Sequence, residues 1–259
     1  MADALVDLDS VADRHAFQEC DALEIAENVP WRHHDQRTQM KLSREAGFIP
    51  DHGERLHPEF IEGNPVLVVI DIMGSGNPKD KATGGIPYMG GQEQLIDRTI
   101  PVIEAAKSSQ IPIVYIIEIH RPDHVDFGRE LDGSEDVHDI EGRPATRIHP
   151  RLPYSEGDYL IPKRRYSAFF GTDLEILLKG LRADTLILCG ELTDVCVHYT
   201  FVDAHQHNYY TRVIEDCVGG STRAAHEASL NAMEYLQTGA RCTHIQAIEA
   251  FNNLTRKGT

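Results

Sequence analysis

The chain has 259 residues, of which 41% are hydrophobic, and its formal net charge is −16 at pH 7. This length and apolar content suffice for one large core, whereas the acidity, with no basic stripe to offset it, excludes a nucleic-acid or anionic-lipid partner. Because the start lacks the features of a signal peptide and no apolar run could span a bilayer, we expect a cytoplasmic protein that binds a small molecule.

The first 64 residues differ in composition from the rest of the chain. They are rich in Asp, Glu, Arg and His, with short helical patterns such as Asp35–Ala46 and no strand signal. From Pro65 onward, apolar β-branched runs alternate with helical stretches, which is typical of a parallel sheet covered by helices. We therefore predict an N-terminal extension or arm over residues 1–64 and a single α/β domain over residues 65–259.

The second part of the chain predicts six strands with helices between them. In chain order, the elements are a strand Val66–Ile72, a helix Gln92–Ser108, strands Ile111–Ile117 and Tyr159–Pro162, a helix Thr172–Leu181, a strand Thr185–Cys189, a helix from Asp194 to about His207, a strand Arg212–Glu215, a helix Thr222–Gln237, a strand Cys242–Ala247 and a short final helix. The polar stretch Glu118–Gly157 is too long for an ordinary connection, which favours an active-site loop.

Three chemically distinctive residues follow predicted strands. Asp71 ends the first strand, Lys163 follows the third, and Cys196 follows the fourth. Each has an ordinary structural interpretation, as a cap, a surface charge or a small buried hydrophobe. In parallel sheets, however, ligands bind beyond the carboxyl ends of the strands, and a thiol with a carboxylate and an ammonium at one edge makes a nucleophile with a base and a charge partner.

Cys196 has a setting that the other cysteines lack. It follows a turn that begins at Gly190 and opens a helical pattern, where amides and the helix dipole would lower the pKa of the thiol and favour the thiolate. The remaining cysteines, Cys20, Cys189, Cys217 and Cys242, show neither CxxC pairing nor zinc-ligand spacing, so we expect reduced thiols and no disulfide framework. For the last three we expect small buried hydrophobes.

The motifs around these residues resemble those of the isochorismatase-like cysteine hydrolases. The segments that carry the resemblance are Val-Val-Ile-Asp71, Pro-Lys163-Arg-Arg-Tyr-Ser-Ala-Phe169 and Gly190-Glu-Leu-Thr-Asp-Val-Cys196-Val, in the family's order and spacing, with Glu215-Asp216 before a helix-start Ser-Thr. The family includes nicotinamidases, carbamoylsarcosine amidohydrolases, and biuret and ureidoacrylate hydrolases. The resemblance runs from about Pro65 to the C-terminus and implies a three-layer Rossmann-like sandwich with a mainly parallel six-stranded sheet.

The resemblance also implies a reaction. Cys196 would attack a carbonyl carbon, Asp71 would act as general base, and Lys163 would orient them and stabilise charge. The family's cis peptide would fall between Glu191 and Leu192, and the amides of Leu192 and Cys196 would form the oxyanion hole. The expected activity is hydrolysis of a carbon–nitrogen bond in a small amide, urea or carbamoyl compound, by a homodimer or homotetramer.

Two other functions remain open within the same family. One is vinyl ether hydrolysis of the isochorismate type, against which Cys196 argues, because relatives with that chemistry lack the nucleophilic cysteine. The other is a non-catalytic binding member, against which the intact triad argues. The family commonly follows its first Asp with Gln and a nearby Phe, whereas Ile72-Met-Gly-Ser-Gly-Asn follows here, so we expect a different substrate wall near Asp71.

A metal site is a further possibility that the resemblance raises. Nicotinamidases carry an Asp-x-His and a later His that bind a metal, and Glu118, His120 and His138 occupy comparable positions here. Carboxylate and imidazole suit Zn, Mn or Fe. Because Glu replaces Asp, and because biuret hydrolases show a similar Glu-x-His-Arg-Pro-Asp stretch without a metal site, we favour an enzyme that requires no cofactor.

Four residues are candidates for substrate contacts. Glu118 and Arg121 would bind polar groups of the substrate or form a local ion pair, which would contribute little to stability. Tyr166 and Phe169 would line the pocket or pack in the core. Which amide or carbamoyl compound is the substrate does not follow from the sequence.

Overall fold

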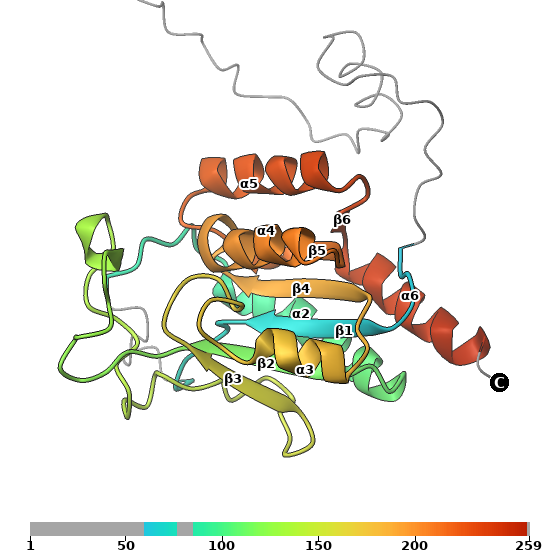
Figure 1. Ribbon diagram of the computed structural model, residues 1–259, viewed down its shortest axis with the longest axis horizontal. Coiled ribbons are helices and arrows are strands. Elements are labelled where there is room, and N and C mark those ends of the chain that lie inside the picture. Colours follow the sequence, from blue (N-terminus) through green and yellow to red (C-terminus); the bar gives the residue numbers. More distant parts are fainter. Residues whose placement is uncertain (1–59, 77–84, 258–259) are drawn as a thin grey trace, which may run out of the picture. The chain divides into compact units, whose positions relative to one another are not determined.

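The computed structural model describes residues 60–76 and 85–257, and its centre is a six-stranded parallel sheet (Figure 1). The strand order is β3-β2-β1-β4-β5-β6. The strands are β1 Pro65–Ile70, β2 Ile113–Glu118, β3 Tyr159–Lys163, β4 Thr185–Glu191, β5 Tyr210–Gly219 and β6 Arg241–Cys242. The helices are α2 Gln92–Ser108, α3 Leu174–Gly180, α4 His198–Gln206, α5 Arg223–Leu236 and α6 His244–Lys257, with short helical turns η1 Glu130–Asp132 and η2 Thr193–Val197. The predicted α/β fold is thus confirmed.

Both faces of the central strands are covered, so β1, β2 and β4 read as nearly continuous apolar runs. In β1, Val66 and Val68 pack in the core shared with α3, α4 and α5, and Leu67 and Val69 pack in the core shared with α2 and α6. All four side chains are fully buried. Such a sheet has no solvent face on its central strands, which leaves the carboxyl ends of the strands as the place for polar chemistry.

The short segment before β1 joins the same domain. The Glu62 amide donates to Thr185 Oγ1 at 2.9 Å, and the Asn64 amide donates to Asp184 Oδ2 at 2.9 Å. Residues 60–64 of the predicted N-terminal extension therefore contact the start of β4. Residues 1–59, which include the predicted helical pattern Asp35–Ala46, lie outside the described residues.

The helix Gln92–Ser108 has the predicted bounds, but the predicted strand Cys242–Ala247 is wrong beyond its first residue. Strand β6 ends at Cys242, and α6 begins at His244. Thr243 explains the change: its Oγ1 accepts from the Gln246 amide at 3.3 Å and its carbonyl oxygen accepts from the Ala247 amide at 3.0 Å. These hydrogen bonds cap a helix start, which ends the strand.

The predicted helix from Asp194 to about His207 begins with the π-helical turn η2 and continues as α4. The side chains at the start of this turn bond to a distant part of the chain. Asp194 Oδ1 accepts from the Ser221 amide at 2.8 Å, and Thr193 Oγ1 lies 2.9 Å from His226 Nδ1. The turn is therefore held against α5 and the residues just before it, with no side-chain cap of its own.

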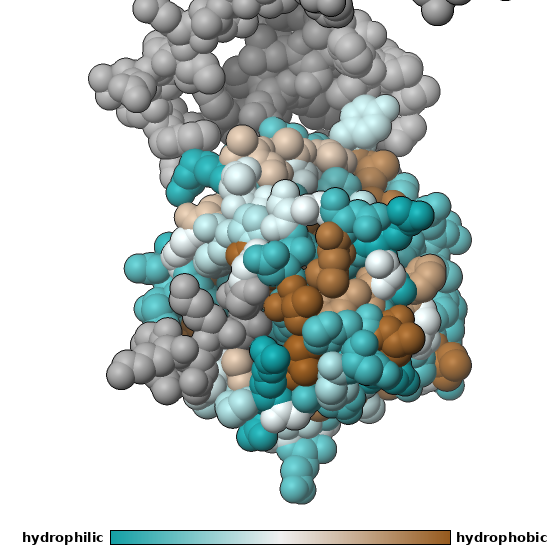
Figure 2. Space-filling model, turned by 90° about the vertical axis from the view of Figure 1, so that its left-hand side faces the viewer, coloured by the Kyte–Doolittle hydropathy of each residue, from teal (hydrophilic) through white to brown (hydrophobic). Residues whose placement is uncertain are grey.

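The carboxyl ends of β1 and β4 point to the left in Figure 1, where much of the long segment between β2 and β3 also lies. The described part of the chain contains no helix long and apolar enough to cross a membrane. Figure 2 views the molecule from that left-hand side and shows a small apolar area bordered by hydrophilic residues. This side carries the candidate site.

Candidate active site

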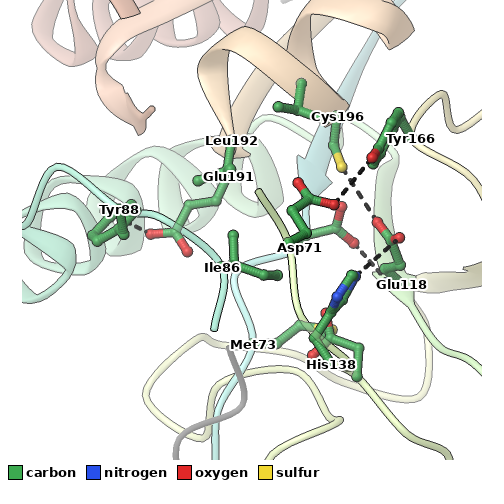
Figure 3. Close-up of a pocket in the computed structure, with 13 residues that line it drawn as sticks. Asp71, Met73, Ile86, Tyr88, Glu118, His138, Tyr166, Glu191, Leu192 and Cys196 are labelled. Atoms are coloured by element: carbon green, nitrogen blue, oxygen red, sulfur yellow. Dashed lines mark hydrogen bonds and ion pairs between the residues drawn. The ribbon is translucent and has the colours of Figure 1, made fainter. Parts of the chain in front are cut away.

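Four strand ends bring four reactive side chains together. Asp71 follows β1, Glu118 ends β2, Lys163 ends β3, and Cys196 lies in the turn after β4. Because these strands are neighbours in a parallel sheet, their carboxyl ends meet at one edge. In Figure 3 the side chains of Asp71, Glu118 and Cys196 point toward one another. We call these four residues the strand-end group.

Lys163 is the centre of the strand-end group. Its Nζ lies 2.9 Å from Asp71 Oδ2 and 3.3 Å from Cys196 Sγ, and it forms an ion pair with Glu118 Oε2. The side chain is fully buried. Burial acts to lower the pKa of this ammonium, but the negative charges of Asp71 and Glu118 raise it well above its usual value. Lys163 therefore stays cationic and balances two buried carboxylates.

Asp71 is held in an uncommon backbone conformation, with φ of 52°. Non-glycine residues rarely adopt it, although aspartate does so more readily than most, and such residues cluster at functional sites. The carboxylate is fixed from its other side by the Glu118 amide, which donates to Asp71 Oδ1 at 2.7 Å. Burial raises the pKa of Asp71 to about 6, against the opposing charge of Lys163. At neutral pH, Asp71 is therefore ionised and able to accept a proton.

The thiol of Cys196 differs from the expected thiolate. Its Sγ lies 3.3 Å from Glu118 Oε2, and only 6% of the residue is exposed. Burial raises the pKa of this thiol well above its usual value, although Lys163 acts in the opposite direction. The predicted lowering of the pKa was wrong because desolvation of the anion outweighs the nearby ammonium. Cys196 therefore rests as a thiol beside groups that can take its proton.

A close approach of two strands shapes the turn that carries Cys196. Gly190 in β4 has φ of 125°, and a Cβ there would lie 1.8 Å from the carbonyl oxygen of Ile70. Only glycine fits this position, so β4 can run directly against the end of β1. One residue further along, the peptide bond between Glu191 and Leu192 is cis, at the place where the resemblance implied one.

A small cavity opens beside these groups, with a volume of about 40 Å³. A cavity needs about 10–15 Å³ to hold one water molecule, so this one has room for about three or four. The described residues that line it are Asp71, Met73, Ile86, Tyr88, Glu118, Glu135, His138, Asp139, Tyr166, Glu191, Leu192, Val195 and Cys196. A cavity of this size suits a compact substrate with few non-hydrogen atoms.

The four candidate substrate contacts lie in different places. Glu118 and Tyr166 line the cavity, and the Tyr166 hydroxyl donates to Glu135 Oε2 at 3.0 Å. Arg121 is not among the lining residues: its Nη1 pairs with Asp126 Oδ2 at 3.1 Å, and 53% of its side chain is exposed. Phe169 is partly buried: it packs against the core shared with α3 and α4 and stacks on His207 with ring centroids 5.1 Å apart.

Several lining residues were not singled out in the sequence. Glu191 is 5% exposed and accepts hydrogen bonds from the Tyr88 hydroxyl at 2.8 Å and from Gln92 Nε2 at 3.0 Å. Burial raises the pKa of Glu191 to about 7 and that of Asp139 to about 8. The length and polarity of the stretch Glu118–Gly157 signalled that it would contribute to a site, but not which of its carboxylates would face inward.

Beside the cavity lies a cluster of four buried side chains that could hold a metal ion: Glu118, His120, Glu130 and His138, whose donor atoms all lie within 4.8 Å of one another. His120 Nε2 is 3.2 Å from both Glu118 Oε1 and Glu130 Oε2, and His138 Nε2 is 3.7 Å from Glu118 Oε1. Two imidazoles and two carboxylates fit Zn, Mn or Fe. Glu130 was not anticipated as a member of this set.

This fold and this site define an isochorismatase-like hydrolase. The sequence model of the isochorismatase domain family matches residues 65–247, which is more than half of the chain. The chain therefore belongs to this family. Its assignment as a hydrolase of carbon–nitrogen bonds agrees with the names of its relatives.

Two such relatives are named amidohydrolases. The maleamate amidohydrolase of Pseudomonas putida is 29% identical over 171 residues, which cover 64% of this chain and 77% of the relative. The ureidoacrylate amidohydrolase of Methylorubrum extorquens is 28% identical over 208 residues, which cover 72% of this chain and 76% of the relative. An isochorismatase-like hydrolase from Alkaliphilus metalliredigens superposes with a TM-score of 0.61 at 28% identity, covering 73% of this chain and 99% of that one.

Proposed function

We propose that the protein is a cysteine amidohydrolase that cleaves the carbon–nitrogen bond of a small amide, urea or carbamoyl compound through a thioester on Cys196. The observation that carries the proposal is the contact of Cys196 Sγ with Lys163 Nζ, at 3.3 Å, while Lys163 Nζ also lies 2.9 Å from Asp71 Oδ2. The nucleophile and the base line one small cavity, and the charge partner contacts both of them.

In the first half of the reaction, Asp71 takes the proton of Cys196 while Sγ bonds to the carbonyl carbon of the substrate. The carbon–nitrogen bond then breaks as protonated Asp71 returns that proton to the leaving nitrogen, and ammonia or an amine departs. In the second half, a water molecule gives a proton to Asp71 and attacks the thioester. The carbon–sulfur bond breaks, and Asp71 returns its proton to Sγ, which restores the Cys196 thiol and releases the acid product. The sum is amide plus water to acid plus amine.

Two backbone amides, those of Leu192 and Cys196, are the proposed oxyanion hole. Both residues line the cavity, at the two ends of the tight turn between β4 and α4. Fixed amide donors of this kind stabilise the negative charge that develops on the carbonyl oxygen. Lys163 is proposed to hold Asp71 and Cys196 in fixed positions relative to each other and to balance the negative charge that moves between them.

We propose that this reaction requires no metal. A divalent cation held by Glu118, His120, Glu130 and His138 would add a positive charge and a Lewis acid next to the cavity. The carboxylates of this cluster already have cationic partners in the protein: Lys163 pairs with Glu118, and Arg165 Nη1 lies 3.9 Å from Glu130 Oε1. Metal analysis of the purified enzyme and its activity after chelation test this point: stoichiometric metal whose removal abolishes turnover would overturn it.

The activity itself is tested by ammonia release from a panel of small amides, with the wild type and Cys196→Ala side by side. The panel comprises nicotinamide, biuret, ureidoacrylate, maleamate, maleamide and carbamoylsarcosine. Release by the wild type and not by the variant is the expected result. Equal release by both proteins would contradict the proposal.

We further propose that the enzyme works in the cytoplasm as a homodimer or homotetramer. The cysteine nucleophile must stay reduced, which suits a reducing compartment. Light scattering at micromolar concentration tests the assembly, and a monodisperse monomer would reject it.

A further inference from the structure

The wall of the cavity is rich in carboxyl groups. Five of the thirteen lining residues carry one: Asp71, Glu118, Glu135, Asp139 and Glu191. They come from both sides of the cavity, since Glu191 ends β4, whereas Glu135 and Asp139 belong to the segment between β2 and β3. In Figure 3, Glu191 and Glu118 lie on opposite sides of Asp71.

Two of these carboxylates, Glu135 and Glu191, are held in place by neutral donors. Tyr166 donates its hydroxyl to Glu135, and Tyr88 and Gln92 donate to Glu191. A neutral donor orients a carboxylate without cancelling its charge. Hydrogen-bond capacity on these oxygens is thus left for a molecule in the cavity.

The described cationic side chains near the cavity, by contrast, are paired with carboxylates of the protein. Among its described lining residues there is no arginine and no lysine, and the one imidazole, that of His138, is directed at Glu118. The arginines of the neighbouring segments are engaged elsewhere: Arg164 pairs with Asp126 at 3.4 Å, and Arg165 bonds to the carbonyl oxygen of Asp126. Lys163 is enclosed by Asp71, Glu118 and Cys196.

We infer that the cavity selects a neutral or cationic substrate that presents several N–H donors and carries no carboxylate. Amides, ureas and guanidine-like compounds have this chemistry, since their N–H groups match carboxylate acceptors. A carboxylate would meet the negative charges of Asp71, Glu118 and Glu135, and no described lining residue is an arginine or lysine that could receive it. Like-charge contacts in a binding site are strongly unfavourable. The names maleamate and ureidoacrylate denote carboxylate-bearing compounds, so the inference separates this chain from those two relatives.

This inference rests on the proposed function, and two matched pairs of compounds test the two separately. The first pair is maleamide and maleamate, which differ only in an amide or a carboxylate at one end. We expect kcat/KM for maleamide, counted per equivalent amide, to exceed that for maleamate by about 100-fold or more. Equal values, or a preference for maleamate, would overturn the inference while leaving the amidohydrolase intact.

The second pair, iodoacetamide and iodoacetate, needs no turnover. Both alkylate Cys196 by displacement of iodide: an S–C bond forms, a C–I bond breaks, and the thiol proton goes to the buffer. Peptide mapping gives the rate at Cys196 for each reagent, and the ratio is divided by that of glutathione. A ratio at least about tenfold in favour of iodoacetamide supports the inference even if no amide is hydrolysed, in which case only the proposed function fails. A ratio near one contradicts the inference.

A variant of a lining residue then tests whether the carboxylates of the cavity wall cause the preference for compounds without a carboxylate. Glu135→Gln keeps the shape of the side chain and its acceptor for Tyr166 but removes the charge, so both ratios should fall by about tenfold. The matched control is Glu104→Gln, on the exposed face of α2, which should change neither ratio. A Glu135→Gln enzyme with the wild-type ratios would show that this carboxylate does not set the selectivity.

Discussion

The strand-end group and three carboxylates of the segment between β2 and β3 all lie at or beside one cavity, yet the two sets are built differently. Asp71, Glu118, Lys163 and Cys196 stand at the ends of adjacent parallel strands, so the register of the sheet fixes their spacing. Glu130, Glu135 and Asp139, which we call the loop group, depend on the path of a segment whose only helix is the short turn η1.

The difference suggests a division of labour. Charges in the strand-end group balance one another through Lys163, which suits groups that must exchange a proton in a fixed geometry. In the loop group, Glu135 and Asp139 line the cavity, where Glu135 accepts from Tyr166, whereas Glu130 lies beside His120 and Arg165. The two lining carboxyl groups are placed to contact a substrate. Changes at the strand ends should therefore affect turnover or stability, and changes in the loop group should affect selectivity.

The largest effect is expected at the nucleophile. Cys196→Ala removes the atom that forms the thioester, so kcat should fall by at least about 10⁴-fold. Cys217→Ala is the matched control. Cys217 is a buried residue of β5, and its substitution deletes a sulfur that lies outside the cavity. Steady-state assays of both variants should show loss of activity in the first only. Comparable rates for the two variants would contradict the division.

The second effect concerns stability. Lys163→Met removes the ammonium between Asp71 and Glu118 and leaves two buried carboxylates without it, which should lower the free energy of unfolding by about 3–5 kcal/mol. Urea denaturation measures this change. Lys179→Met, which removes a surface ion pair with Glu175 in α3, should cost less than about 1 kcal/mol. A Lys163→Met protein as stable as the wild type would show that the ion pairs of Lys163 with Asp71 and Glu118 contribute little to the free energy of unfolding.

The pH dependence of the reaction reports the charge of the strand-end base. Because the pKa of Asp71 is raised to about 6 and its ionised form accepts the proton, kcat/KM should rise with pH and level off above 6. At one unit below that value, about a tenth of the maximum should remain. A profile that stays flat between pH 5 and 7 would exclude Asp71 as the base.

The smallest effect is expected at Arg121. Its side chain is half exposed and pairs with Asp126 outside the cavity, so Arg121→Ala should change kcat/KM less than about twofold and stability by less than about 1 kcal/mol. The same assays measure both quantities. A loss of tenfold or more in kcat/KM would show that Arg121 reaches the substrate after all.

The sequence predicted the strand-end group better than the loop group. Asp71, Lys163 and Cys196 each follow an apolar run, and a parallel sheet brings such positions to one edge, so their proximity could be expected. Glu135 lies in an acidic stretch that reads like any solvated loop, and nothing local shows that Tyr166 turns it inward. Periodicity does not report the path of an irregular segment.

Local chemistry accounts for the other differences. The run after Cys242 is apolar enough for a strand, yet Thr243 starts a helix by accepting two amide hydrogen bonds. The expectation of a thiolate considered the helix start but not the burial of Cys196, and burial dominates its pKa. Both cases turn on contacts that only the folded chain defines.

The most direct test of the proposed mechanism is mass spectrometry of enzyme quenched in acid within the first turnover of a hydrolysed amide. We expect a transient acyl group on the peptide that contains Cys196, which disappears as the acid product forms. Turnover with the acyl group on another residue, or with no acyl group on the protein at any time sampled, would contradict it.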